Sequence, residues 1–159
     1  MKDLGSIFLA GHKGMVGSCI LRRFERRGYK NIFIKDKKEL DLTNQISVQS
    51  FFDKYKPDTV ILAAAKVGGI ATNAENQVAF LYENLMIQNN VMLSAANAGA
   101  KRIIFLVSSC IYPRECNQPI KEEYLLTGPL EKTNEGYALA KISGLKLAKF
   151  ISEKYSIDC

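Results

Sequence analysis

A short apolar run, three evenly spaced glycines and an amphipathic segment open the chain, and this succession restricts the fold more than any other feature. Residues 6–10 read Ser-Ile-Phe-Leu-Ala, residues 11–17 read Gly-His-Lys-Gly-Met-Val-Gly, and the amphipathic segment continues to Arg27. A strand, a glycine turn and a helix in this order begin a β-α-β unit, whose strands pair in parallel. We therefore predict an α/β protein with a Rossmann-like, doubly wound parallel sheet flanked by helices.

The glycine loop indicates dinucleotide binding. Gly11 would allow the tight turn, Gly14 would let the backbone approach a pyrophosphate, and Gly17 would let the helix pack closely on its strand. Free N–H groups and the dipole at the helix N-terminus favour an anion there. The spacing is G-x-x-G-x-x-G rather than the stricter G-x-G-x-x-G. The loop residues that we assign to the cofactor are Gly11, Lys13, Gly14, Met15, Val16 and Gly17.

The charged run Lys35-Asp36-Lys37-Lys38 follows the next expected strand, residues 31–35, where the adenosine ribose of the cofactor should lie. Asp36 would accept a hydrogen bond from a free 2′-hydroxyl and favours NAD, whereas Lys37, Lys35 and Lys13 would hold a 2′-phosphate. Three cations around one carboxylate favour NADP(H). The alternative is a solvated charge run after an edge strand.

The middle of the chain supplies further segments of the same architecture. We expect a helix from Asp41 to about Tyr55 with Thr43 as its N-cap, and a strand over residues 59–63. Small residues after that strand would leave room for a ligand. One long helix should cover residues 74–98, with Gly99 as its C-terminal cap. The cofactor contacts assigned here are Asp41, Leu42, Ala63, Ala64 and Ala65.

A serine, a tyrosine and a lysine form the candidate catalytic group. Ser108 follows the expected strand over residues 102–107, and Tyr137 and Lys141 are four residues apart in a helical sequence. Residues at that spacing share one helix face, and the ammonium would lower the pKa of the phenol. Such a tyrosine can protonate a carbonyl oxygen while a reduced nicotinamide supplies hydride. Taken alone, the tyrosine and lysine could be a chance pair.

Composition limits the class of protein. The chain has 159 residues, enough for one domain, and a net charge of +6 from scattered lysines and arginines. That charge suits a phosphorylated small molecule better than nucleic acid, and no apolar run approaches a membrane span. The cysteines lack metal-ligand spacing and follow no signal peptide, which predicts a reduced, cytoplasmic protein. They are Cys19, Cys110, Cys116 and Cys159.

Four blocks carry a resemblance to the extended short-chain dehydrogenase/reductases that act on nucleotide sugars, and within them to the GDP-L-fucose synthases. The blocks are residues 10–17, 62–70, 108–113 and 133–141. The resemblance implies an NADPH-dependent enzyme that epimerises and reduces a GDP-4-keto-6-deoxy sugar, with catalytic Ser108, Tyr137 and Lys141. It also implies Cys110 as the epimerisation thiol, Lys13 and Lys37 as 2′-phosphate contacts, and a homodimer paired through two helices.

The chain departs from this family in two ways. Gly136 and Lys132 occupy positions where the family usually has proline. The family also has a substrate domain of comparable size, whereas this sequence ends at residues 156–159, where another core strand should begin. We expect residues 1–159 to form the NADP-binding Rossmann domain, truncated before the substrate domain and possessing a single histidine, His12, which is unsuited to be the second epimerisation acid.

Three functions stay open on the sequence. The first is the GDP-L-fucose type of epimerase and reductase, and the second is a sister reductase of another GDP-4-keto sugar such as a deoxyheptose. The third is a non-catalytic NADP-binding module. Water elimination is disfavoured, because Ser109 and Cys110 stand where related dehydratases have an acid and a base.

Overall fold

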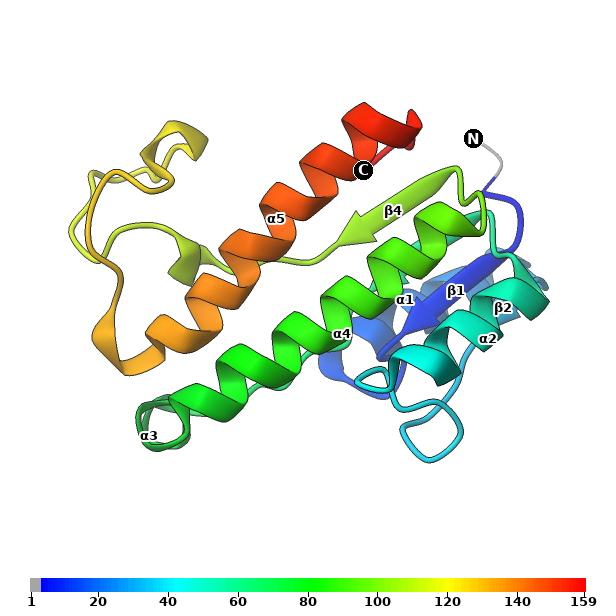
Figure 1. The fold of residues 1–159 in the computed structure, drawn as a ribbon, viewed down its shortest axis with the longest axis horizontal. Helices are drawn as coiled ribbons and strands as arrows, with labels where there is room; N and C mark the ends of the chain where they lie inside the picture. The colour runs from blue at the N-terminus through cyan, green and yellow to red at the C-terminus, as the bar shows by residue number, and fades with distance from the viewer. Residues whose placement is uncertain (1–3) are drawn as a thin grey trace.

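Four parallel strands form the sheet of the computed structural model, which describes residues 4–159. Their order is β2-β1-β3-β4, so β1 lies between β2 and β3, and the predicted α/β architecture is confirmed (Figure 1). The register places Ile7 opposite both Ile32 and Thr59. The strands are β1 Ile7–Ala10, β2 Ile32–Phe33, β3 Thr59–Leu62 and β4 Arg102–Phe105.

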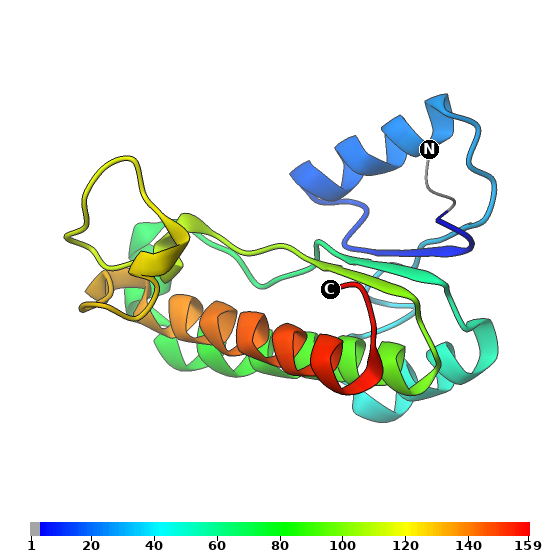
Figure 2. The ribbon, with the colours of Figure 1, turned by 90° about the horizontal axis from the view of Figure 1, so that it is seen from above.

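Helices cover both faces of the sheet. Figure 2 shows α1 on one side of the strands, and α2, α4 and α5 on the other. Three short 3₁₀ turns, η1, η2 and η3, lie in the long connection between β4 and α5. The helices are α1 Met15–Arg26, α2 Gln45–Tyr55, α3 Ile70–Glu75, α4 Gln77–Asn97 and α5 Glu135–Tyr155, and the turns are η1 Ser109–Ile111, η2 Glu122–Tyr124 and η3 Lys132–Asn134.

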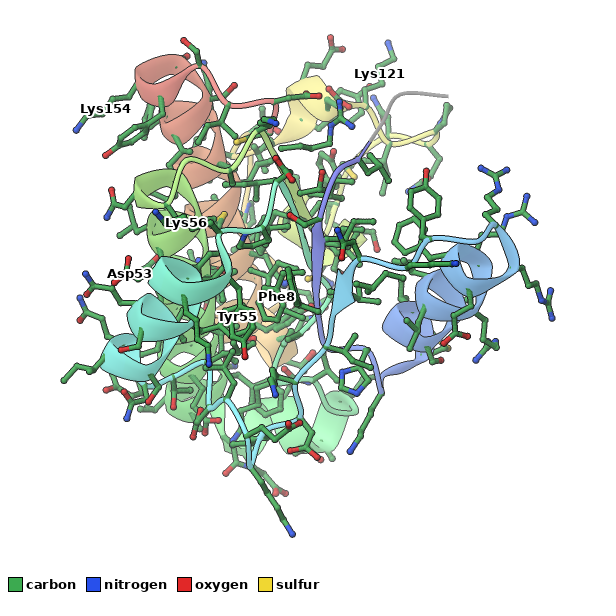
Figure 3. All side chains as sticks on the ribbon, turned by 90° about the vertical axis from the view of Figure 1, so that its right-hand side faces the viewer. Phe8, Asp53, Tyr55, Lys56, Lys121 and Lys154 are labelled. Carbon is green, nitrogen blue, oxygen red and sulfur yellow. The ribbon has the colours of Figure 1, made fainter. Side chains whose placement is uncertain are left out.

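Strand β1 contributes to two hydrophobic clusters because successive side chains of a strand point to opposite faces. Phe8 belongs to the larger cluster under α2 and α4, and its ring centroid lies 4.5 Å from that of Phe51. Ile7 and Leu9 belong to the smaller cluster under α1. Figure 3 shows Phe8 and Tyr55 between the sheet and α2. All of β1 is buried, as a central strand covered on both faces should be.

Strand β4 is shorter and less covered than the sequence predicted. The regular strand ends at Phe105 rather than residue 107, and Ile104 is 40% exposed. Ile103 is buried against the helices on the opposite face. The apolar run had indicated burial on both faces of β4. Within residues 4–159, α1 covers the sheet near β1 only, so the face of β4 that carries Ile104 is open (Figure 2).

The predicted single helix over residues 74–98 is wrong. It is divided into α3 and α4 at Asn76, whose backbone leaves helical geometry at φ −125° and ψ 34°. The side-chain Nδ2 of Asn76 donates to the carbonyl of Thr72 at 3.1 Å. The C-terminal end is confirmed, because Gly99 follows α4 with φ +81° and donates its N–H to Ala96.

The start of α2 also differs from the prediction. Asn44, rather than Thr43, is the N-cap, and its side chain accepts from the Ser47 N–H at 3.0 Å. Thr43 is held instead by Asp41, whose Oδ1 accepts from its backbone N–H and its hydroxyl. Because the Thr43 hydroxyl donates to Asp41 within the turn, the next side chain, that of Asn44, caps the helix.

After α5 the chain returns to the sheet. Asp158 forms a parallel bridge with Arg102, and their side chains pair at 2.8 Å. Ile157 is buried in the main core. This pairing agrees with the prediction that another strand begins here. Within residues 4–159, no helix is both long and apolar enough to cross a membrane.

Candidate functional site

The glycine loop is built by close backbone approach. Gly11 follows β1 with φ +88°, and a Cβ there would lie 2.6 Å from the backbone nitrogen of Ala64. A Cβ on Gly17 would overlap the carbonyl of Gly11. Both glycines are therefore required by the protein itself, as the sequence predicted. Gly14 differs, because its Cβ would meet only the Gly11 oxygen at an ordinary 3.4 Å.

The N-terminus of α1 has the features of an anion site. Gly14 is its N-cap, no side chain caps the helix, and its first turn contains no acidic residue. Met15 is 87% exposed, so the turn is open to solvent. The Nδ1 of His12 is buried without a hydrogen-bond partner in the described structure. Unpaired N–H groups and the helix dipole fit a phosphate at this position, so the predicted loop residues could hold a pyrophosphate.

The basic run after β2 carries a network of its own. Lys13 Nζ lies 3.1 Å from Asp36 Oδ2, which brings the glycine loop next to the segment that was predicted to lie at the adenosine ribose. The hydrogen bond from Lys13, together with the Glu39 backbone N–H, lowers the pKa of Asp36. Lys35 pairs with Glu39 at 2.8 Å, so its charge is directed to Glu39 rather than to a 2′-phosphate. Lys37 is exposed and stays available to a ligand phosphate.

Loop 63–69, after β3, is fixed by an asparagine that the sequence reasoning missed. Asn84 of α4 accepts from the Lys66 N–H at 2.9 Å and donates to the Lys66 carbonyl at 3.0 Å. Ala64 packs against Gly11, so this loop and the glycine loop share one edge of the sheet. A signal was present in the sequence, since α4 places the polar residues Asn84, Gln88 and Asn90 among buried positions. Buried amides of this kind usually bind backbone groups.

Lys141 lies at the centre of the candidate catalytic group. Its side chain is buried, and Nζ donates to the Leu106 carbonyl at 2.9 Å. The same ammonium lies 4.5 Å from the ring centroid of Phe105 and 5.7 Å from that of Tyr137. Burial lowers its pKa to about 8, and the charge of Cys110 acts in the opposite direction. The strand-end segment and α5 thus meet as predicted.

The predicted lowering of the Tyr137 pKa is wrong. Burial raises the pKa of Tyr137, and the neighbouring Cys110 raises it further. The ammonium of Lys141 donates its hydrogen bond to the Leu106 carbonyl. Tyr137 is therefore protonated at neutral pH, which is the form that a proton donor requires.

Ser108 and Cys110 lie in the turn that faces α5. Ser108 precedes η1 and is partly buried, and its carbonyl accepts from the Ile111 N–H at 3.2 Å. Cys110 is within η1 and affects the pKa of both Tyr137 and Lys141, so the thiol belongs to the same cluster. Structure and sequence agree in bringing a strand-end turn to the tyrosine and lysine of α5.

Comparison with known proteins identifies the family. The model of the NAD dependent epimerase/dehydratase family matches residues 7–159. The chain belongs to this family. It is 54% identical over 140 residues to GDP-L-fucose synthase 1 of Arabidopsis thaliana, covering 88% of this chain and 43% of the relative. It is 45% identical over 152 residues to GDP-L-fucose synthase of Escherichia coli K12, covering 96% and 47%.

Solved structures of the family agree. A GDP-mannoheptose C4 reductase from Campylobacter jejuni with NADP bound superposes with a TM-score of 0.94 at 38% identity, over 99% of this chain and 46% of that one. The chain thus spans about half the length of the relatives that it matches. The resemblance to the first half of GDP-L-fucose synthases is confirmed.

Proposed function

We propose that this chain is the cofactor-binding part of an NADPH-dependent enzyme that epimerises and reduces a GDP-4-keto-6-deoxy sugar, the reaction type of GDP-L-fucose synthesis. The observation that carries the proposal is the buried Lys141, with its ammonium 5.7 Å from the Tyr137 ring and Cys110 close by. The identity to the synthases named above supports it.

Each residue of the cluster has a role in carbonyl reduction. The bound NADPH supplies the hydride. Tyr137, protonated at neutral pH, donates its proton to the sugar carbonyl oxygen, and the Ser108 hydroxyl orients that oxygen by a hydrogen bond. Lys141, whose pKa is about 8, is mostly charged at pH 7 and stabilises the phenolate that Tyr137 leaves behind. A tyrosine with a raised pKa is a weaker acid, so this stabilisation by Lys141 is necessary.

The Cys110 thiol gives the site a second activity. A thiolate can remove a proton from the carbon next to a ketone, and inversion then requires a second acid that protonates the opposite face. Cys110 lies in η1, after β4, and its effect on the pKa of Tyr137 and Lys141 places it close to both, where the ketone would be held. Epimerisation therefore precedes reduction in this proposal, and Cys110 exchanges the proton.

A reductase without epimerisation is the second candidate. The likeness to the GDP-mannoheptose C4 reductase favours it. The two activities separate in D₂O, because proton exchange next to the ketone incorporates deuterium at carbon and reduction by unlabelled NADPH does not. Deuterium incorporation that Cys110→Ser abolishes would support epimerisation, whereas reduction without incorporation would support the second candidate.

NADP(H) is the proposed cofactor. The open first turn of α1 would hold the pyrophosphate, Ala63, Ala64 and Ala65 would border the cofactor, and Lys141 would contact the nicotinamide ribose. Lys13 and Lys37 would bind the 2′-phosphate, with Asp41 and Leu42 beside the adenosine. The carbonyl of Leu42 accepts from Asn90, which fixes this turn against α4.

The proposed assembly is a homodimer paired through α4 and α5. Apolar side chains lie exposed along one run of α4, with Val78 at 82%, Tyr82 at 60% and Leu93 at 42%. On α5, Leu139 and Phe150 are also exposed. Burial of such a face against its symmetry mate would form a four-helix bundle. Sedimentation velocity tests the dimer, and a Tyr82→Glu variant should shift it to monomer.

A cytoplasmic location is also proposed. All four cysteines are free thiols, which fits a reducing compartment. Fractionation of cells that express a tagged protein, probed for the tag, checks the location.

Turnover tests the reaction. The complete protein that contains this chain should oxidise NADPH when GDP-4-keto-6-deoxy-mannose is added, followed at 340 nm. Tyr137→Phe should lower kcat by about a hundredfold or more while the NADPH dissociation constant stays within about twofold. Turnover that survives Tyr137→Phe would refute the catalytic assignment. NADPH binding without any turnover would favour the non-catalytic module.

A further inference from the structure

Gln77 joins the beginnings of two helices that are far apart in the sequence. It is the first residue of α4, and its Nε2 donates to the Lys132 carbonyl of η3 at 2.6 Å. Its Oε1 accepts from the Gly136 N–H, in the first turn of α5, also at 2.6 Å. Figures 1 and 2 both show the starts of α4 and α5 side by side. One side chain thus fixes the segment that leads directly into Tyr137.

Helix α5 lacks a cap from its own N-terminal residue. Asn134 occupies the N-cap position but makes no capping hydrogen bond, and its Oδ1 is buried without a partner in the described structure. The first N–H groups of a helix need acceptors from outside its own hydrogen-bond pattern. For Gly136, Gln77 provides that acceptor from a different helix. The cap of α5 is therefore a tertiary contact.

Gly136 fits this contact in two ways. A Cβ at this position would lie 2.6 Å from the backbone oxygen of Gln77 and 3.0 Å from its Oε1, so a side chain would push the helices apart. Its N–H donates the hydrogen bond that Gln77 accepts, and a proline at this position would have no N–H to donate. Gln77 and Gly136 are therefore a matched pair.

We propose that Gln77 is a positioning residue for Tyr137: by capping α5 from α4, it sets where the first turn of α5, and with it the phenol, lies relative to the turn that carries Ser108 and Cys110. The inference rests on the proposed function in treating Tyr137 as the proton donor. A hydroxyl that must reach a carbonyl oxygen is sensitive to small displacements, since misplacement by about 1 Å can cost roughly a hundredfold in rate.

The test is a set of matched substitutions at Gln77 in the complete protein. Gln77→Met keeps the length of the side chain and removes both hydrogen bonds, so kcat should fall about tenfold or more while the NADPH dissociation constant changes by less than about twofold. Gln77→Glu keeps an acceptor for the Gly136 N–H and should recover most of kcat. If Gln77→Met does not fold, Gln77→Glu decides alone: loss of kcat equal to that of Gln77→Ala overturns the proposal.

Gln88→Met is the control on the same pair of helices. Gln88 Nε2 donates to the Ala140 carbonyl at 2.7 Å, so its loss also weakens the contact between α4 and α5. We expect Gln88→Met to lower stability and leave kcat within about twofold of the unmodified protein. Equal losses of kcat in Gln77→Met and Gln88→Met would show general loosening and overturn the specific role.

Amide hydrogen exchange separates this inference from the proposed function. The Gly136 amide should exchange slowly in the unmodified protein and at least about tenfold faster in Gln77→Met. Fast exchange of the Gly136 amide in both the unmodified protein and Gln77→Met would overturn the cap, whatever turnover the enzyme shows. Protection lost in Gln77→Met, in a protein whose turnover survives Tyr137→Phe, would refute the proposed role of Tyr137 and with it the positioning role.

Discussion

The ammonium of Lys141 lies 5.7 Å from the centre of the Tyr137 ring, one helical turn along α5, and donates its hydrogen bond to the Leu106 carbonyl. A buried cation that is bound to the end of a strand holds α5 against β4 and keeps a positive charge beside the phenol.

Lys141 should make stability depend on alkaline pH. Its pKa is about 8 in the folded protein against a usual 10.5, so between these values the unfolded chain holds more protons. The free energy of unfolding should therefore rise from pH 8 to 10.5, by about 3 kcal/mol at most. Urea unfolding at several pH values measures it. Lys141→Met should abolish this rise, and the exposed Lys146→Met on the same helix should keep it.

Asp58 should make the free energy of unfolding depend on pH in the acid range. Hydrogen bonds from Lys101 and Ser6 lower its pKa from 3.8 to about 2. A lowered folded pKa gives stability that is present above the unfolded value and lost as pH falls towards about 2. The urea midpoint should fall between pH 4 and 2, and less so in Asp58→Asn. The exposed Asp53→Asn is the control and should keep the dependence of the unmodified protein.

Gly17 and Gly14 should respond differently to alanine. A Cβ on Gly17 overlaps the Gly11 carbonyl, so Gly17→Ala should destabilise the fold by about 1–3 kcal/mol. Gly14→Ala meets ordinary contact only, and its melting temperature should barely change. Its methyl group would instead obstruct the pyrophosphate and weaken NADPH binding about tenfold or more. Calorimetry and titration together measure both effects. Normal NADPH affinity in Gly14→Ala would contradict the proposed site.

Lys37 should decide cofactor preference. Lys13 already pairs with Asp36, whereas Lys37, the next residue after Asp36, has an exposed side chain that should meet a 2′-phosphate. Lys37→Glu should weaken NADPH about tenfold or more and leave NADH nearly unchanged. Isothermal titration with both cofactors measures the ratio. Lys54→Glu changes the net charge equally on the exposed side of α2, and an equal effect there would mean that only the overall charge matters.

Much of this protein follows from local sequence pattern. Short apolar runs, glycine turns and helical segments in alternation predicted a parallel sheet, because these patterns depend on neighbours in the chain. The backbone roles of Gly11 and Gly17 were predicted correctly for the same reason, since a tight turn and a close helix approach leave few residue types possible. The meeting of Tyr137 and Lys141 with the end of β4 also followed from the order of the elements.

The tertiary structure decided what depends on distant partners. Burial together with Cys110 raised the pKa of Tyr137, although the helical spacing alone predicted a lower one. Asn84 and Gln77 bind backbone groups 18 and 55 residues away in the sequence, and no local pattern identifies those partners. The local pattern fixes which residues can share a helix face, but hydrogen-bond partners and desolvation depend on which segments pack together. The sequence therefore named the candidate catalytic group, and packing determined its protonation and its position.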